Sequence, residues 1–65
     1  MADYRRQVIE ILKQRNCRFD RKGKGDHEIW RAPNGKKFPV DSKILSRHTA
    51  NAILKQAGIN DIKIP

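Results

Sequence analysis

The spacing of hydrophobic residues changes twice along this chain, and this change limits the folds that it can adopt. Apolar side chains recur at helical spacing near both ends, whereas the middle alternates at a period of two between glycine-containing turns. Helices and strands bury one face at these respective spacings. The pattern therefore predicts two amphipathic helices on either side of a block of antiparallel strands, and it argues against an unstructured basic tail.

The first helix is predicted over residues 3–15. Asp3 is suited to cap its N-terminus, and Asn16 suits the left-handed conformation that often follows a helix. The positions that form its apolar stripe are Tyr4, Val8, Ile11 and Leu12.

The second helix is predicted to begin at a cap provided by Ser46 or Thr49 and to end before Gly58. Its apolar stripe consists of Ala50, Ile53, Leu54 and Ala57. Residues 59–65 are expected either to fray or to add a short strand.

Three strands are predicted between the helices, over residues 17–22, 27–31 and 36–40. In the first strand, Phe19 is expected to share a half-buried face with Arg21. Glycines in the segment Lys22-Gly23-Lys24-Gly25 form the first turn, and Pro33-Asn34-Gly35 forms the second. Pro39 indicates that the third strand lies at an edge or ends early.

Two helices on one face of a three-stranded antiparallel sheet make an α+β fold with a single core. This α-β-β-β-α order resembles the topology of double-stranded-RNA-binding domains. Residues 1–65 are predicted to form one domain with no internal linker.

Charge limits the class of partner. Fifteen Lys and Arg residues against seven Asp and Glu residues give a net charge of +8 on 65 residues. This excess predicts a polyanionic ligand, and so small a core is unsuited to a deep pocket for a large cofactor. No apolar run approaches the roughly 18 residues that span a membrane, and no signal peptide is recognisable. The single cysteine, Cys17, fits a reducing compartment, so we expect a cytoplasmic location.

His27 follows a flexible, positively charged turn and is the main candidate for catalysis. RNA supplies its own nucleophile, the 2′-hydroxyl, so a histidine with cations beside it can cleave RNA without a metal. Lys22, Lys24 and Arg31 are near enough in sequence to supply those cations. The same pattern also fits an ordinary histidine at the edge of a strand.

Alternate side chains of the second strand face opposite sides of the sheet, so there are two possible orientations for His27 and Trp30. If His27 faces solvent, Trp30 enters the core, which suits a chain with only four aromatic residues. The opposite parity would bury His27. We favour the first alternative, which also leaves Ile29 on the open face.

Other candidate sites are weaker. Arg47 and His48 lie in the first turn of the second helix, where backbone N–H groups can hold a phosphate, although an ordinary solvated turn is the simpler explanation. Cys17 and the two histidines lack the paired spacing of a zinc site, and no P-loop motif occurs. We therefore predict neither a metal nor a cofactor.

Two segments carry a family resemblance. Residues 23–30, GKGDHEIW, resemble the glycine-rich turn and histidine strand of HicA toxins (YcfA-like proteins). Residues 46–59, SRHTANAILKQAGI, are similar to the second helix of that family. The first helix also fits, so the resemblance covers residues 4–59.

The resemblance implies a type II toxin–antitoxin system, an mRNA interferase activity and neutralisation by a HicB-type antitoxin that covers the active site. The single catalytic histidine of the family corresponds to His27. Many members have Ser or Thr where this chain has Asp26, and a second histidine where it has Glu28. A carboxylate at position 26 is suited to orient the imidazole, but it would also repel a phosphate.

Two further functions stay open at this point. An RNA-binding module without catalysis would rest on the same charge and topology, with His27 as one phosphate contact among several. A DNA-binding domain is less well supported, because the second helix offers few side chains that read bases.

Overall fold

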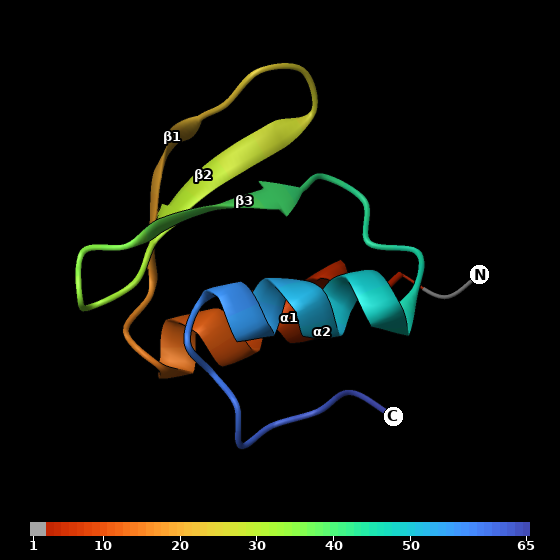
Figure 1. Cartoon of the computed structure of the whole chain (residues 1–65). Coiled ribbons are helices and arrows are strands. Elements are labelled where there is room, and N and C mark those ends of the chain that lie inside the picture. Colours follow the sequence, from red (N-terminus) through yellow and green to blue (C-terminus); the bar gives the residue numbers. More distant parts are fainter. Residues whose placement is uncertain (1–2) are drawn as a thin grey trace.

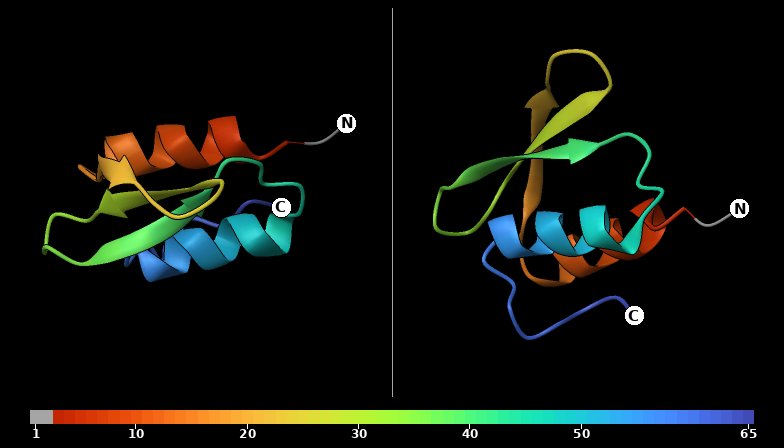
Figure 2. Two further views of the ribbon diagram at one scale, coloured as in Figure 1. Left: turned by 90° about the horizontal axis from the view of Figure 1, so that it is seen from above. Right: turned by 45° about the vertical axis from the view of Figure 1, so that its right-hand side comes forward.

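The structure is a computed structural model that describes residues 3–65. It contains two helices and three strands in the order α1 (Arg5–Gln14), β1 (Arg18–Lys22), β2 (His27–Arg31), β3 (Lys37–Asp41) and α2 (Arg47–Gln56). The strands form one antiparallel sheet in the order β1-β2-β3. Both helices lie on the same side of this sheet, and the other side is uncovered (Figure 1, Figure 2). The predicted α+β fold, similar to double-stranded-RNA-binding domains, is therefore confirmed.

The turn between β2 and β3 sets which side chains share a face. The N–H of Ala32 donates to the carbonyl of Lys36, and the register pairs Trp30 with Phe38 and Glu28 with Val40. Cross-strand partners project to the same side of a sheet. Trp30 and Phe38 are buried against the helices, so we call their side the closed face and the opposite side the open face.

A bulge in β1 overturns one prediction. Phe19 pairs with Trp30, but after the irregularity at Asp20 it is Arg21 that pairs with Ile29. The extra residue shifts the alternation, so Phe19 projects on the closed face and Arg21 on the open face. The expectation that Phe19 and Arg21 share a face is wrong for this reason.

The core lies between the closed face and the helix pair. Trp30 is 4% exposed, which confirms the predicted parity of β2. The largest fully buried side chains come from both helices, from β3 and from the loop that follows it: Val8, Leu12, Phe38, Val40, Ile44 and Leu54. None of the helices within residues 3–65 has the length and apolar character needed to cross a membrane.

The N-cap predicted for α2 is confirmed, but the N-cap of α1 is Tyr4, whose side chain makes no capping hydrogen bond, and not Asp3. Asp3 accepts a hydrogen bond from the N–H of Arg5, and Ser46 Oγ accepts one from the N–H of Thr49. Ser46 is thus the cap of α2. The side chain of Asn51, within α2, forms hydrogen bonds with the N–H and the carbonyl of Ile64, a buried residue in the tail that follows this helix. The C-terminal tail therefore packs against α2 and forms no strand.

Candidate functional site

His27 and Asp41 lie opposite each other at one end of the open face. They are the first residue of β2 and the last residue of β3, and the register pairs them directly. Nδ1 of His27 is 2.8 Å from Oδ1 of Asp41, while the histidine side chain remains 54% exposed. A carboxylate at this position favours a proton on Nδ1 and so leaves Nε2 as the basic nitrogen of the neutral ring.

An open hollow adjoins this pair and carries two lysines. Its lining residues are Lys24, Gly25, Asp26, His27, Asp41, Ser42 and Lys43. Lys24 comes from the turn before β2, as predicted, whereas Lys43 comes from the loop after β3 and was not predicted. The two lysines contribute positive charge to the hollow, which the carboxylates of Asp26 and Asp41 partly offset.

The turn before His27 depends on two glycines. Gly25 has a φ of +66°, a conformation that other residues rarely adopt. A Cβ on Gly23 would lie 3.2 Å from Cδ1 of Ile29 and 3.3 Å from the carbonyl oxygen of His27. The N–H of Gly23 donates to that same carbonyl over 2.8 Å, so the turn and the start of β2 are held closely together.

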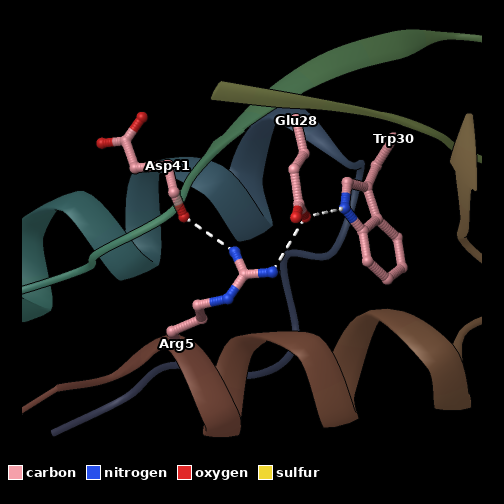
Figure 3. A network of polar contacts seen from close by, with 4 residues as sticks. All are labelled: Arg5, Glu28, Trp30 and Asp41. Atoms are coloured by element: carbon pink, nitrogen blue, oxygen red, sulfur yellow. Dashed lines mark hydrogen bonds and ion pairs between the residues drawn. The ribbon is translucent and has the colours of Figure 1, made fainter. Parts of the chain in front are cut away.

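A polar network supports the same end of the sheet from the closed face (Figure 3). Arg5, in the first turn of α1, donates from Nη2 to Glu28 Oε1 and from Nη1 to the backbone carbonyl of Asp41, both over 2.9 Å. Trp30 Nε1 donates to the same Glu28 oxygen over 3.1 Å. The carboxylate of Asp41 points away from Arg5, toward the open face (Figure 3). Arg5 thus holds the backbone of the residue whose side chain contacts His27.

This network fixes the charge of Glu28. The hydrogen bond from Arg5 lowers the pKa of the Glu28 carboxyl, and the bond from Trp30 and the nearby charge of Lys22 lower it further. Lys22 pairs with Glu28 across β1 and β2, so it lies on the closed face. Glu28 is therefore an ionised carboxylate that links β2 to α1 on the closed face.

Residues 5–59 match the model of a family described as the HicA toxin of bacterial toxin–antitoxin. The chain belongs to the HicA toxin family. It is thus the toxin component of a toxin–antitoxin system, whose partner is an antitoxin. Comparison with the curated proteins and with the solved structures found no match.

Of the basic residues predicted for the site of this HicA toxin, only Lys24 lies beside His27. Lys22 projects on the closed face. Arg31 is at the opposite end of β2, four residues or about 13 Å along the strand. Arg47 is exposed at the start of α2 and is not among the residues that line the hollow.

The carboxylate beside the histidine also differs from the expectation. The sequence suggested Asp26, but the contact to His27 Nδ1 comes from Asp41. The backbone carbonyl of Asp26 instead accepts a hydrogen bond from the N–H of Ser42, which ties the turn to the loop after β3. In residues 3–65, no group of three or more His, Cys, Asp or Glu side chains is arranged to hold a metal ion.

Proposed function

We propose that this HicA toxin is an endoribonuclease that cleaves mRNA without a metal, with His27 as its acid–base residue. The observation that carries the proposal is the exposed imidazole with a carboxylate 2.8 Å from Nδ1 and two lysines around the same hollow. RNA needs no external nucleophile, so a general base and cations are sufficient for the reaction.

In this mechanism Nε2 of neutral His27 removes the proton from a ribose 2′-hydroxyl. The 2′-oxygen attacks the adjacent phosphorus, the bond from phosphorus to the 5′-oxygen breaks, and that oxygen takes a proton from the exposed imidazolium of His27 or from solvent water. The products are a 2′,3′-cyclic phosphate and a 5′-hydroxyl. Asp41 holds the ring in the required tautomer and stabilises the imidazolium that forms.

Lys24 and Lys43 bind the phosphate in this proposal. Both line the hollow beside His27, and negative charge accumulates on the phosphate oxygens as the 2′-oxygen attacks. The exposed position of His27 lets an RNA strand reach the base without any deep pocket, which suits a chain of 65 residues.

The same exposure supports a mode of neutralisation. A HicB-type antitoxin that covers the open face around His27 would exclude RNA from the base. Because mRNA is a cytoplasmic substrate, the proposal also includes a cytoplasmic location for the toxin.

The second candidate is an RNA-binding module without catalysis. It is favoured by the two carboxylates, Asp26 and Asp41, that line the hollow and weaken its hold on a phosphate. In that case binding should weaken steeply with salt through the release of counterions, and loss of the imidazole should alter affinity only modestly.

A cleavage assay in EDTA tests the proposal. Purified toxin is incubated with mRNA, and His27→Ala is compared with His48→Ala, which removes an exposed histidine outside the hollow. We expect cleavage by the wild type and by His48→Ala, and a loss of about 100- to 10,000-fold for His27→Ala. Equal rates for the wild type and His27→Ala would refute the role of His27. Binding without cleavage by the wild type would favour the second candidate.

A further inference from the structure

An exposed aromatic ring lies at the free edge of the sheet, far from His27. Phe19 is 51% exposed, although it projects on the closed face, because β1 is an edge strand that rises away from the helix pair (Figure 1). Its ring meets Trp30 in an edge-to-face arrangement with centroids 6.2 Å apart and planes at 84°. Contact with a buried indole restrains the ring of Phe19 while much of it stays accessible.

The surroundings of Phe19 are polar and basic. The hollow beside it is lined by Lys13, Asn16, Cys17, Arg18, Phe19 and Trp30. An aromatic platform with cations around it is the combination that binds single-stranded nucleic acid, because bases stack on the ring and phosphates contact the cations.

An independent observation concerns Arg18 and Arg31. The register places these two arginines directly opposite each other in neighbouring strands, an arrangement of like charges that destabilises a sheet. Within residues 3–65 neither has a carboxylate within 4.0 Å. Arg21 and Lys37, by contrast, lie 3.7 and 3.8 Å from the carboxylate of Asp20. An anion from outside the chain would relieve the repulsion between Arg18 and Arg31.

Arg18 connects the aromatic ring to this arginine pair. It lines the hollow beside Phe19 and also a second hollow that contains Arg31 and the turn between β2 and β3. Phe19 projects on the closed face, whereas Arg18 and Arg31 project on the open face. A ligand that passes around the free edge of β1 can therefore contact the ring with one part and the arginines with another.

We propose that Phe19, Arg18 and Arg31 form a subsite for the RNA strand at the free edge of β1, where one base stacks on Phe19 and a neighbouring phosphate lies between the arginines. This inference rests on the proposed function. Because Arg31 is about 13 Å along β2 from His27, the subsite binds a nucleotide away from the cleaved bond. RNA explains both features, whereas an apolar segment of a protein partner would explain the ring but leave the arginines unpaired.

Binding of an RNA that cannot be cleaved tests the stacking. A fluorescent oligonucleotide with 2′-O-methyl riboses lacks the nucleophile, and its anisotropy reports affinity for the full-length toxin. Phe19→Ala should weaken binding about 5- to 100-fold, the effect expected from one stacked base. Phe19→Trp should retain wild-type affinity or exceed it. Leu45→Ala, which removes another exposed apolar side chain, is the matched control and should bind as the wild type does.

The arginines are tested by salt titration. Arg18→Gln and Arg31→Gln should each weaken binding and reduce the slope of log affinity against log salt by about one, as expected for one lost phosphate contact. Arg21→Gln, whose guanidinium lies near Asp20, should change the slope less. The subsite would be overturned if Phe19→Ala, Arg18→Gln and Arg31→Gln all had the same RNA affinity and the same salt slope as the wild type.

These outcomes separate the subsite from the proposed function. If the wild type binds RNA and His27 is needed for cleavage, but Phe19→Ala binds as tightly as Leu45→Ala, only the subsite is refuted. Loss of antitoxin binding in Phe19→Ala with unchanged RNA affinity would also refute it, in favour of a protein contact. A wild type that does not bind RNA refutes both proposals.

Discussion

The two faces of β2 carry different kinds of residue. On the open face His27 is exposed, contacts one carboxylate and adjoins lysines that come from loops. On the closed face Glu28 and Trp30 are hydrogen-bonded to each other and, through Glu28, to α1. Residues next to each other in the chain thus differ in whether they are free to meet a ligand.

The comparison shows how so small a domain can combine an exposed reactive group with a precise geometry. The strand period of two places the supporting residues directly behind the reactive one. Arg5 connects the two sides of this arrangement, because its guanidinium donates hydrogen bonds to the Glu28 carboxylate and to the backbone carbonyl of Asp41, whose side chain contacts His27. We therefore expect substitutions on the closed face to change mainly stability, and those on the open face to change mainly activity.

Replacement of the closed-face aromatic residue should have the largest effect on stability. Trp30 is 4% exposed, and Trp30→Ala removes a large core side chain and the donor to Glu28. We expect a loss of about 3–5 kcal/mol in the free energy of unfolding. Urea titration followed by far-ultraviolet circular dichroism measures it. Arg31→Ala, on the open face of the same strand, is the control. A comparable loss of stability in this variant would contradict the claim that the closed face of β2 mainly determines stability.

Removal of the carboxylate beside His27 should affect activity rather than stability. Asp41→Asn keeps the shape of the side chain but removes its charge, and it should lower RNA cleavage by about 10- to 100-fold, the value of a hydrogen bond to a charged group. The cleavage rate and an unfolding curve of the same sample measure both effects. Asp26→Asn is the matched control in the same hollow. If Asp26→Asn lowers the rate and Asp41→Asn does not, Asp41 is not the residue that orients His27.

Acid should weaken the closed face through Glu28. The hydrogen bond from Arg5 lowers the pKa of Glu28 in the folded protein below its ordinary value of 4.5. A carboxyl with this shift stabilises the fold above its unfolded pKa, and the contribution is lost as the pH falls through the folded pKa. At pH values below about 4.5, the free energy of unfolding should therefore decrease, and the loss of this one charge should account for roughly 1 kcal/mol of the decrease.

Unfolding curves of Glu28→Gln between pH 6 and pH 3 sharpen this prediction. The variant should be less stable than the wild type at pH 6, and the difference should shrink as the pH falls. Glu10→Gln, on the exposed side of α1, should follow the wild-type pH dependence. A constant difference between Glu28→Gln and the wild type at every pH would show that the charge of Glu28 is not what stabilises the closed face.

Much of this fold follows from local patterns in the sequence. Helical spacing located both helices, and the Asn34-Gly35 turn located the hairpin of β2 and β3. The need to bury Trp30 indicated that His27 is exposed, as the structure confirms. The position of this turn also predicts which residues of β2 and β3 pair, although this pairing was not among the predictions made from the sequence. A hairpin centred on residue 34 pairs residues at equal distances from it, and this places His27 opposite Asp41.

Other features depend on contacts that local patterns do not encode. The bulge at Asp20 turns Phe19 and Arg21 to opposite faces, and no glycine marks it in the sequence. The bond between Arg5 and Glu28 joins residues 23 positions apart and requires α1 to pack beneath the sheet. Lys24 and Lys43 line one hollow because β3 pairs with β2. These residues were missed because tertiary packing, and not sequence spacing, brings them together.

The rate of RNA cleavage per folded molecule tests the central claim most directly. It is measured for His27→Ala and for Trp30→Leu, with the folded fraction of each sample taken from its unfolding curve. We predict that His27→Ala lowers this rate about 100- to 10,000-fold while Trp30→Leu stays within a few-fold of the wild type. If His27→Ala retains the wild-type rate per folded molecule, the open face of β2 does not carry the chemistry.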